Sequence, residues 1–589
     1  MTESLTIDRD ADVRGGIRVL WDVEVPVRDG TILRADVFLP LDDKPVPVIL
    51  SHGCYAKGIS FQEGYAQQWS RMVADFPEIE RHGSNQFQCW EVADPERWVP
   101  GGYAVVRVDS RGAGRSPGVQ ELWSQQEVHD YYDAIEWAGS QPWSDGNVGL
   151  LGISYYAANQ WRVAALRPAH LKAIVPWEGA SDLYRELYYH GGIRSTFLDS
   201  WAPRQLAMQH GYGERGLRHP HTGKPVAGDV TLSDQELAAN RVDVVAKVRA
   251  HPLLDAFHAD QAVDWARVDV PVLSSANWGG QGLHLRGNVE GFVSSASTDK
   301  WLEIHGLEHW THFYTDYGLG LQRRFLDHFL KGLDNGWDNQ PPVSLQVRHV
   351  DGFVQRDENE WPLARTTWER RFLDAADRSL GLAPRTSQGV TYQPEGDGVT
   401  FLTEAFAAEA EVTGPLAATI YISSSTQDAD LFVVVGLVDP DGDEVVFRGA
   451  MDEHTPVAQG WLRASHRALD EARSLPYRPF HPHDAVEPLV PGRVYRLDVE
   501  IWPTSVVIPA GYRLSLMVAG RDYEYAGPMS DPSNSYHRYP SRGCGPFLHP
   551  FGPDRPVEIY GGDVTIHTGP GYPSSLLLPI VPSKEAARE

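Results

Sequence analysis

An apolar run at residues 147–152 leads through Ile153 and Ser154 directly into a helix-like stretch that extends to about residue 166. The glycine two positions before the serine, Gly152, lets a strand and a helix pass closely at a sharp turn. Such a turn exposes the serine hydroxyl at the N-terminus of the helix. The segment therefore predicts a nucleophile elbow with Ser154 at its tip, and it departs from the common pattern at Tyr156, where a second glycine is usual.

Strand-like and helix-like runs alternate on both sides of this turn. Strands are expected at residues 23–27, 32–38, 46–50, 103–108, 171–176, 270–273 and 300–304, and helices at residues 125–139 and 318–333. This alternation predicts a parallel, doubly wound sheet, as in an α/β-hydrolase domain. It breaks between residues 179 and 265, where helix-like pieces at about 183–189 and 237–248 lie among polar, histidine-rich loops, so we expect an inserted helical cap there.

The chain changes character beyond about residue 341. Strand-like runs recur there without a comparable helical period, at residues 416–423, 431–438, 494–501 and 513–518. This pattern is typical of an all-β sandwich or jelly roll. A chain of 589 residues also exceeds the roughly 250–300 residues that one hydrophobic core supports. We therefore expect an α/β-hydrolase domain at residues 1–178 and 266–338, a helical cap at 179–265 and a C-terminal jelly-roll domain at 339–589.

The composition excludes several classes of partner. The net charge of −27 disfavours binding to nucleic acids and to anionic membranes. No apolar stretch reaches the roughly 18 residues of a membrane span, and the N-terminus lacks the pattern of a signal peptide. Three cysteines without a CxxC spacing predict neither a disulfide framework nor a zinc site. We expect a cytoplasmic protein without metal or organic cofactor, and a homo-oligomer stays possible.

A serine hydroxyl is a weak nucleophile and needs a neighbouring base. In α/β-hydrolases the histidine follows the last strand of the sheet, and the chain order is serine, acid, histidine. His309 follows the expected strand at residues 300–304 and is the predicted base, with His305 as the nearest competitor. The predicted oxyanion hole combines the backbone N–H of Tyr155, the residue after the nucleophile, with a donor from the loop after residues 46–50, where Tyr55 lies.

Long segments in a fixed order extend this pattern along nearly the whole chain. They are ADVFLP, DSRGAGRSPG, WSDGNVGLLGISYYA, GLEHW and HFLKGLDNG, followed by SSSTQDADLFVVVGLVDPDG, RASHRALD, LVPGRVYRLDVEIWPTS and IPAGYRLSLMVAGRD. On these segments the chain resembles the cocaine esterase and Xaa-Pro dipeptidyl-peptidase family, whose relatives include α-amino acid ester hydrolases and glutaryl-cephalosporin acylases. The resemblance implies that Ser154 is the nucleophile, His309 the base, and the Tyr55 hydroxyl an oxyanion donor with the Tyr155 N–H. It also implies a C-terminal jelly roll that closes one side of the active site.

The acid of the triad is the point at which the chain departs from this family. Members usually carry an aspartate in a Trp-Tyr-Asp-like segment, but residues 275–281 read SANWGGQ and contain no carboxylate. We favour Glu178, because it follows the expected strand at residues 171–176 and the ends of parallel strands meet at one crevice. Asp182 is an alternative acid, and Asn277 could orient the histidine as an amide. A weak or inactive dyad and an acid elsewhere in the chain are also open.

These residues predict two-step acyl transfer from a small-molecule ester, or from an amide, through an acyl-enzyme on Ser154. The runner-up within hydrolases is an Xaa-Pro dipeptidyl-peptidase or acylase. A peptidase of that kind needs a clamp for the substrate's α-amino group, for which Glu186 in the cap is a candidate. The alternative of another class is a non-catalytic ligand- or carbohydrate-binding protein with a decayed site.

Overall fold

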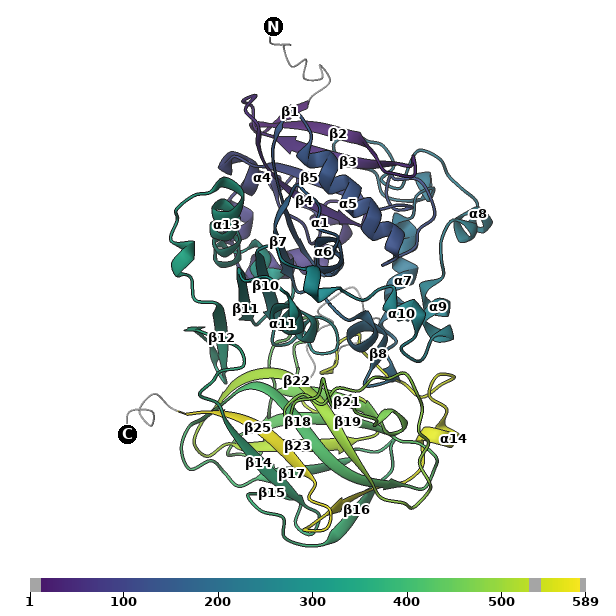
Figure 1. Cartoon of the computed structure of the whole chain (residues 1–589), viewed down its shortest axis with the longest axis vertical. Coiled ribbons are helices and arrows are strands. Elements are labelled where there is room, and N and C mark those ends of the chain that lie inside the picture. Colours follow the sequence, from purple (N-terminus) through teal and green to yellow (C-terminus); the bar gives the residue numbers. More distant parts are fainter. Residues whose placement is uncertain (1–11, 529–541, 583–589) are drawn as a thin grey trace.

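The first part of the chain is built on one sheet, which occupies the upper half of the computed structural model in Figure 1. The structure describes residues 12–528 and 542–582. The strands, in spatial order, are β1 (Asp12–Arg14), β2 (Ile17–Pro26), β3 (Ile32–Leu39), β5 (Ala104–Asp109), β4 (Val46–Gly53), β6 (Ser144–Ile153), β7 (Leu171–Trp177), β10 (Val272–Asn277), β11 (Lys300–His305), β12 (Val343–His349) and β13 (Gly352–Glu358). All pairings from β5 to β12 are parallel, as the alternation of strands and helices predicts.

Helices cover both faces of this sheet, since successive side chains of a buried strand point to opposite sides. On β7, Ile174 packs into the cluster that contains α5 (Gln125–Gly139) and α6 (Tyr155–Ala165). The next residue, Val175, packs into the cluster that contains α13 (Asp316–Lys331). The helix predicted at residues 125–139 is confirmed with the same bounds, and its start is fixed by Ser124, whose side chain accepts from the Glu127 N–H.

The smaller helices of the first part lie in the loops between strands. They are α1 (Phe61–Gly64), α2 (Ala66–Asp75), α3 (Glu78–Arg81), α4 (Pro95–Trp98), α11 (Leu285–Ser294) and α12 (Thr311–Tyr314). Between β7 and β10 lie a π-helical turn at Tyr184–Tyr188, the short strands β8 (Tyr189–His190) and β9 (Ile193–Arg194), α7 (Phe197–Gln205), α8 (Asp234–Ala239), α9 (Val244–Ala250) and α10 (Ala256–Ala259). The helix-like piece at 237–248 is thus two helices, because Asn240 ends α8 and Asp243 caps a new start at α9.

The last part of the chain is rich in β-structure and has its own core. Its strands are β14 (Thr367–Asp374), β15 (Ser379–Gly381), β16 (Gln388–Tyr392), β17 (Val399–Thr403), β18 (Ala410–Ser424), β19 (Asp430–Val438), β20 (Glu444–Val445), β21 (Ala458–Arg463), β22 (Tyr495–Ile508), β23 (Arg513–Ala519), β24 (Val564–Thr568) and β25 (Ser575–Val581), with a short helix α14 (Val557–Tyr560). The long strands β18 and β22 pair antiparallel, and β19 lies between β21 and β23. Alternate residues of these strands, such as Leu431 and Val433, fill the core of this part.

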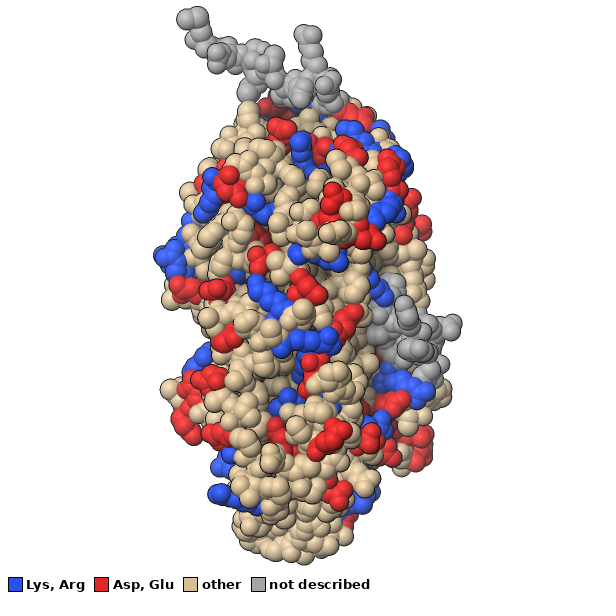
Figure 2. Space-filling model, turned by 90° about the vertical axis from the view of Figure 1, so that its right-hand side faces the viewer, with Lys and Arg blue, Asp and Glu red and all other residues tan. Residues whose placement is uncertain are grey.

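The two parts meet at α11 and β12. Leu285 and Val289 of α11 pack in one cluster with Trp461 and Trp502 of the C-terminal part. On the same helix Arg286 forms an ion pair with Glu500 of the C-terminal part and another with Glu186 of the first part. The face shown in Figure 2 carries basic and acidic side chains interspersed. Among the described residues, no helix is long and apolar enough to cross a membrane.

Candidate active site

Ser154 lies at the turn between β6 and α6, with the backbone angles φ 58° and ψ −113°. A residue other than glycine rarely adopts a positive φ, and such strain is concentrated at functional sites. A side chain at Gly152 would lie 2.5 Å from Cβ of Tyr156, and one at Gly53 would lie 2.5 Å from the ring of Tyr156. The two glycines therefore make the space that Tyr156 fills, which explains how a tyrosine replaces the usual second glycine of the elbow.

The turn is tied to the neighbouring strand by its backbone. The N–H of Ser154 lies 3.1 Å from the carbonyl oxygens of both Trp177 and Glu178, at the end of β7. The N–H of Ile153 donates to the carbonyl of Glu91, 3.0 Å away. These contacts fix the position of the serine before any substrate arrives.

The imidazole that contacts the serine belongs to His284. Its Nε2 lies 3.0 Å from Oγ of Ser154. His284 is the residue directly before α11, in the connection that leaves β10. Burial lowers the pKa of His284 well below its usual value, and the neighbouring His309 lowers it further, so the ring is neutral and can accept a proton.

His309, the predicted base, lies one ring further from the serine. Its ring centroid is 6.0 Å from that of His284, and its Nε2 is 3.0 Å from Oε1 of Glu91. The N–H direction is not aligned with that carboxylate oxygen, so the contact is an ion-pair distance and not a well-formed hydrogen bond. Burial and His305 together lower the pKa of His309 to about 3. The assignment of His309 as base stays a prediction, because its ring is in the site but is not the one at hydrogen-bond distance from Ser154.

The structure places Glu178, the favoured acid, against a different histidine. Oε1 of Glu178 lies 3.0 Å from Nε2 of His305, and Glu303 lies 2.8 Å from the other nitrogen of that ring. Burial alone would lower the pKa of His305, but the two carboxylates outweigh it and raise the pKa to about 9. Glu178 thus neutralises a buried imidazolium behind the elbow, and its contacts are with His305 and not with His309.

The alternative acid Asp182 and the alternative orienting amide Asn277 also have other partners. Asn277 donates to Oε1 of Glu178 at 3.3 Å and to the carbonyl of Leu307 at 2.7 Å. Asp182 lies 2.6 Å from a guanidinium nitrogen of Arg185. Burial would raise the pKa of Asp182, but Arg185 and Arg286 outweigh it and lower the pKa. Both residues therefore have local structural partners in place of a catalytic histidine.

A small apolar pocket opens in front of Ser154. Its volume is about 30 Å³, and it is lined by Tyr55, Trp123, Ser154, Tyr155, Ala158, Ala180, Leu183, Leu187, Phe197, Trp201, Leu283 and His284. The structure thus brings both predicted oxyanion residues, Tyr55 and Tyr155, to the same pocket as the serine. The Tyr155 hydroxyl donates to the carboxylate of Glu127 at 2.7 Å, which fixes the side chain, and burial raises the pKa of Glu127 to about 7.

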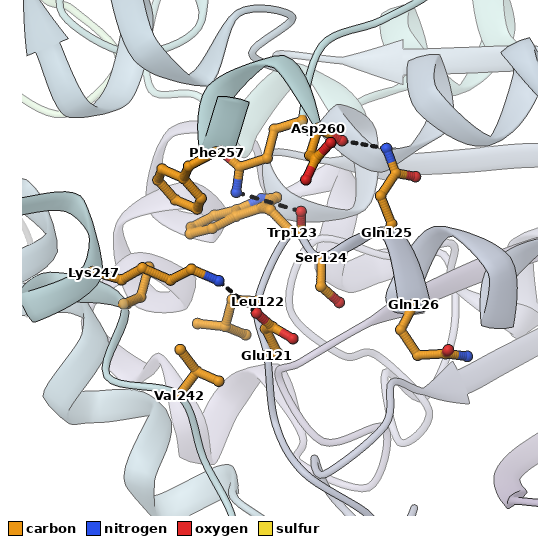
Figure 3. Close-up of a pocket in the computed structure, with 12 residues that line it drawn as sticks. Glu121, Leu122, Trp123, Ser124, Gln125, Gln126, Val242, Lys247, Phe257 and Asp260 are labelled. Atoms are coloured by element: carbon orange, nitrogen blue, oxygen red, sulfur yellow. Dashed lines mark hydrogen bonds and ion pairs between the residues drawn. The ribbon is translucent and has the colours of Figure 1, made fainter. Parts of the chain in front are cut away.

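A second, larger pocket of about 240 Å³ also has Trp123 in its lining (Figure 3). Polar groups stand at its edge, among them the ion pair between Lys247 and Glu121, 2.7 Å apart. Trp123 lines both pockets and stacks on Trp201, with ring centroids 5.4 Å apart. Its backbone has a φ of 55°, which is unusual for so bulky a residue. Trp123 therefore borders both an inner apolar pocket and an outer pocket.

Within the described part of the chain, no group of three or more histidine, cysteine, aspartate or glutamate side chains is arranged to hold a metal ion.

Comparison with a solved structure decides the family. A CocE/NonD family hydrolase from Staphylococcus aureus is 31% identical in sequence, covers 96% of this chain and 94% of its own, and superposes with a TM-score of 0.82. The chain belongs to the CocE/NonD family of hydrolases. The model of the X-Pro dipeptidyl-peptidase (S15 family) matches residues 29–314, and that of the X-Pro dipeptidyl-peptidase C-terminal non-catalytic domain matches residues 335–577. The resemblance inferred from the sequence is confirmed.

Two other relatives extend the comparison. The cocaine esterase of a Rhodococcus species is 25% identical, with 97% of this chain and 100% of the relative covered. A protein named putative serine esterase from Mycobacterium tuberculosis is 26% identical, with 88% of this chain and 93% of the relative covered.

The sequence did not point to two residues near Ser154 of this CocE/NonD hydrolase, His284 and Glu91. The rule that the base follows the last strand directed attention to residues after β11, whereas His284 follows β10. A signal for His284 existed, because residues that follow any of the parallel strands face the same crevice. Glu91 lies in an irregular loop before β5, and nothing in its local sequence points to the elbow.

Proposed function

We propose that this protein is a serine esterase that cleaves carboxylic esters with a short, uncharged acyl group. The observation that carries the proposal is the 3.0 Å contact between Oγ of Ser154 and Nε2 of His284, at a strained turn inside an apolar pocket. A serine hydroxyl and a neutral imidazole at this distance are the parts needed for nucleophilic catalysis. The names of two relatives, cocaine esterase and putative serine esterase, agree with this activity.

The proposed reaction proceeds in two halves. Oγ of Ser154 attacks the ester carbonyl carbon as its proton passes to Nε2 of His284, and the electron pair of the C=O bond moves to the oxygen. When this oxyanion collapses, the bond to the alcohol oxygen breaks and the proton on His284 passes to that oxygen. A water molecule then attacks the acyl-enzyme, with His284 taking its proton, and the acid leaves as Ser154 regains its hydrogen.

Tyr55 and Tyr155 are the proposed oxyanion donors. Tyr155 is the first residue of α6, and the first N–H groups of a helix have no partner within the helix. Donors that are fixed before the reaction stabilise the charge that develops on the carbonyl oxygen. The hydroxyl of Tyr55, which lines the same pocket, supplies the second donor.

The pocket favours short, neutral acyl groups. A cavity of about 30 Å³ holds roughly two groups of the size of a water molecule. Its lining residues carry no carboxylate to receive the α-amino group of a peptide. Glu186, the candidate clamp, instead lies 2.9 Å from Arg286 and accepts from the Ser181 N–H at 2.7 Å. These contacts support an esterase over an Xaa-Pro dipeptidyl-peptidase.

The proposal includes a role for the C-terminal part, as a jelly roll that closes one side of the site. The N–H of His309 donates to the carbonyl of Ala450 at 3.2 Å, and Arg448 pairs with the adjacent Glu308. We keep the domain limits expected from the sequence. The proposed hydrolase domain comprises residues 1–178 and 266–338, the cap residues 179–265 and the jelly roll residues 339–589. The substrate is a small molecule, and acyl transfer to serine requires no cofactor.

The test is a comparison of p-nitrophenyl acetate and butyrate with alanyl-proline p-nitroanilide. We expect kcat/KM for acetate to exceed that for the dipeptide anilide by at least about a hundredfold, and a fluorophosphonate probe to label the protein covalently. A preference for the dipeptide anilide would assign the protein to the peptidases. A chain that neither hydrolyses these substrates nor reacts with the probe would be a binding protein with a decayed site.

Replacing Trp123 with alanine should change the preference for acyl length. The variant joins the inner and outer pockets, and each buried methylene contributes about 0.8 kcal/mol, so room for two more methylenes is worth roughly tenfold in rate. We expect the ratio of kcat/KM for p-nitrophenyl octanoate to that for acetate to rise by that factor. An unchanged ratio would mean that the acyl group does not lie against Trp123. Rates are compared well below the melting temperature, since the loss of a buried tryptophan costs about 3–5 kcal/mol.

A further inference from the structure

Buried polar atoms without an aligned hydrogen-bond partner cluster beside Ser154. Among the described residues they include Nδ1 of His284, both ring nitrogens of His309 and Oε2 of Glu91. All three side chains are at least nine-tenths buried. Most buried polar groups in proteins have a partner, and exceptions that gather at one place call for a functional explanation.

A catalytic imidazole that takes a proton becomes a buried cation. In the Ser–His–Asp arrangement a carboxylate at the other ring nitrogen stabilises that charge. Nδ1 of His284 has no such partner, and the nearest ring with a carboxylate on it is that of His309, whose Nε2 is 3.0 Å from Glu91. Ser154, His284, His309 and Glu91 thus lie one after another in the site.

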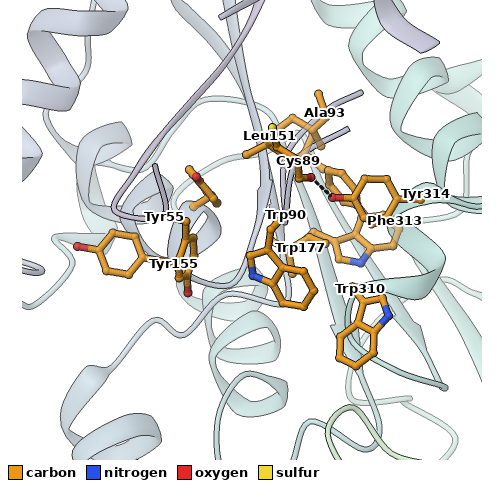
Figure 4. Close-up of a cluster of buried hydrophobic side chains, with 14 of the residues drawn as sticks. Tyr55, Cys89, Trp90, Ala93, Leu151, Tyr155, Trp177, Trp310, Phe313 and Tyr314 are labelled. Carbon is orange, nitrogen blue, oxygen red and sulfur yellow. Dashed lines mark hydrogen bonds between the residues drawn. The ribbon is translucent and has the colours of Figure 1, made fainter. Parts of the chain in front are cut away.

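The position of Glu91 is fixed as firmly as that of the serine. Its backbone has a φ of 61°, a strained value for a glutamate, and its carbonyl accepts from Ile153, the residue before Ser154. The two residues before Glu91 are held by aromatic side chains. Trp90 stacks on Tyr65 with ring centroids 4.0 Å apart. The Tyr314 hydroxyl donates to the carbonyl of Cys89 at 3.0 Å (Figure 4). The loop therefore holds a buried carboxyl near the elbow at the cost of backbone strain. Such strain is concentrated at functional sites, which indicates a functional role for Glu91.

We propose that Glu91 is the carboxylate of this active site and acts through His309, which it orients and polarises toward His284. This inference rests on the proposed serine esterase activity. As charge develops in the reaction, the Nε2–H of His309 turns to Glu91, and the lone pair of its Nδ1 faces His284, directly or through one water molecule. Catalytic hydrogen bonds that are poorly aligned in a free enzyme tighten when the charge develops. Glu91 and His309 are positioning residues, and His284 is the group that exchanges the proton.

The charge state of Glu91 should be visible in the pH dependence of kcat/KM. Burial and the nearby Glu178 raise the pKa of Glu91 well above its usual value. The carboxylate form therefore appears only as the pH rises through that raised pKa, and kcat/KM should fall as the pH falls through it. This fall is the acid limb of the pH–rate profile, and removal of the charge of Glu178 should move it to lower pH. The titratable groups that face Glu91 are His309, Glu178, Tyr156, Tyr314 and Cys54.

The experiment uses the single variants Glu91→Gln and His309→Gln and the double variant that combines them. Glu178→Gln is the matched control. We expect each of the first two to lower kcat for p-nitrophenyl acetate by about a hundredfold with little change in KM, and the double variant to fall no further. Glu91→Asp, which keeps the charge on a shorter side chain, should recover part of the rate. The acid limb should disappear in Glu91→Gln and shift downward in Glu178→Gln.

Two results would overturn the inference. One is a Glu91→Gln variant whose kcat and acid limb match those of the wild type. The other is a hundredfold loss in Glu178→Gln alone, which would make Glu178 the acid. If Glu91→Gln does not fold, His309→Gln and Glu91→Asp carry the same test, because each alters the pair without removing the buried carboxyl. An inert wild type is a separate failure, since it removes the esterase activity itself and the inference with it.

Discussion

Replacing Ser154 with alanine should lower kcat for p-nitrophenyl acetate by about a millionfold, the scale seen when serine hydrolases lose their nucleophile. The hydroxyl is the only group of this residue that contacts the base, at 3.0 Å from Nε2 of His284, so its loss removes the covalent route. What activity remains would come from the oxyanion donors and from binding alone. The measurement is the steady-state rate together with fluorophosphonate labelling, which should vanish.

Ser154→Gly separates this chemical effect from damage to the fold. The φ of 58° at this position strains serine and alanine alike, whereas glycine adopts it readily. We therefore expect Ser154→Gly to be as inactive as Ser154→Ala. Its melting temperature should be higher than that of Ser154→Ala. Wild-type rates in either variant would show that the hydrolysis occurs elsewhere and would remove Ser154 from the mechanism.

The fold was predictable because its signals are local. The helix at residues 125–139 was found with its true bounds, since the apolar period of α5 and the cap at Ser124 lie in the same short segment. The strands of the sheet were found within a few residues for the same reason. Ser154 was also predictable, because strand, glycine, serine and helix follow one another directly in the chain.

The histidine that contacts Ser154 was not predictable because a distant segment positions it. The loop from β10 to His284 is anchored through Gln281, whose amide donates to the carbonyls of Pro456 and Val457 at 3.2 Å. Those residues belong to the C-terminal part, about 175 positions further along the chain. A rule based on chain order placed the base after β11, and it carried no information about that anchor.

Replacing His284 with glutamine should have the second largest effect, a loss of about 10⁵- to 10⁶-fold in kcat. Glutamine fills a similar space and still contacts Oγ of Ser154, but it cannot accept a proton at neutral pH. His309→Gln is the matched variant on the neighbouring ring, 6.0 Å away, and should lose only about a hundredfold. The reverse order, with His309→Gln nearly dead and His284→Gln active, would make His309 the base, as the chain order predicts.

The pH dependence of Glu91→Gln tests His284 independently. His284 must be neutral to accept the serine proton, so kcat/KM falls as the pH falls through its pKa. Burial and His309 hold that pKa well below 6.5, whereas the raised pKa of Glu91 sets the limb in the wild type. Once Glu91 is removed, the remaining limb should lie in the acid range and be absent from the residual rate of His284→Gln. An acid limb that stays at its wild-type position in Glu91→Gln would mean that neither Glu91 nor the buried ring of His284 sets it.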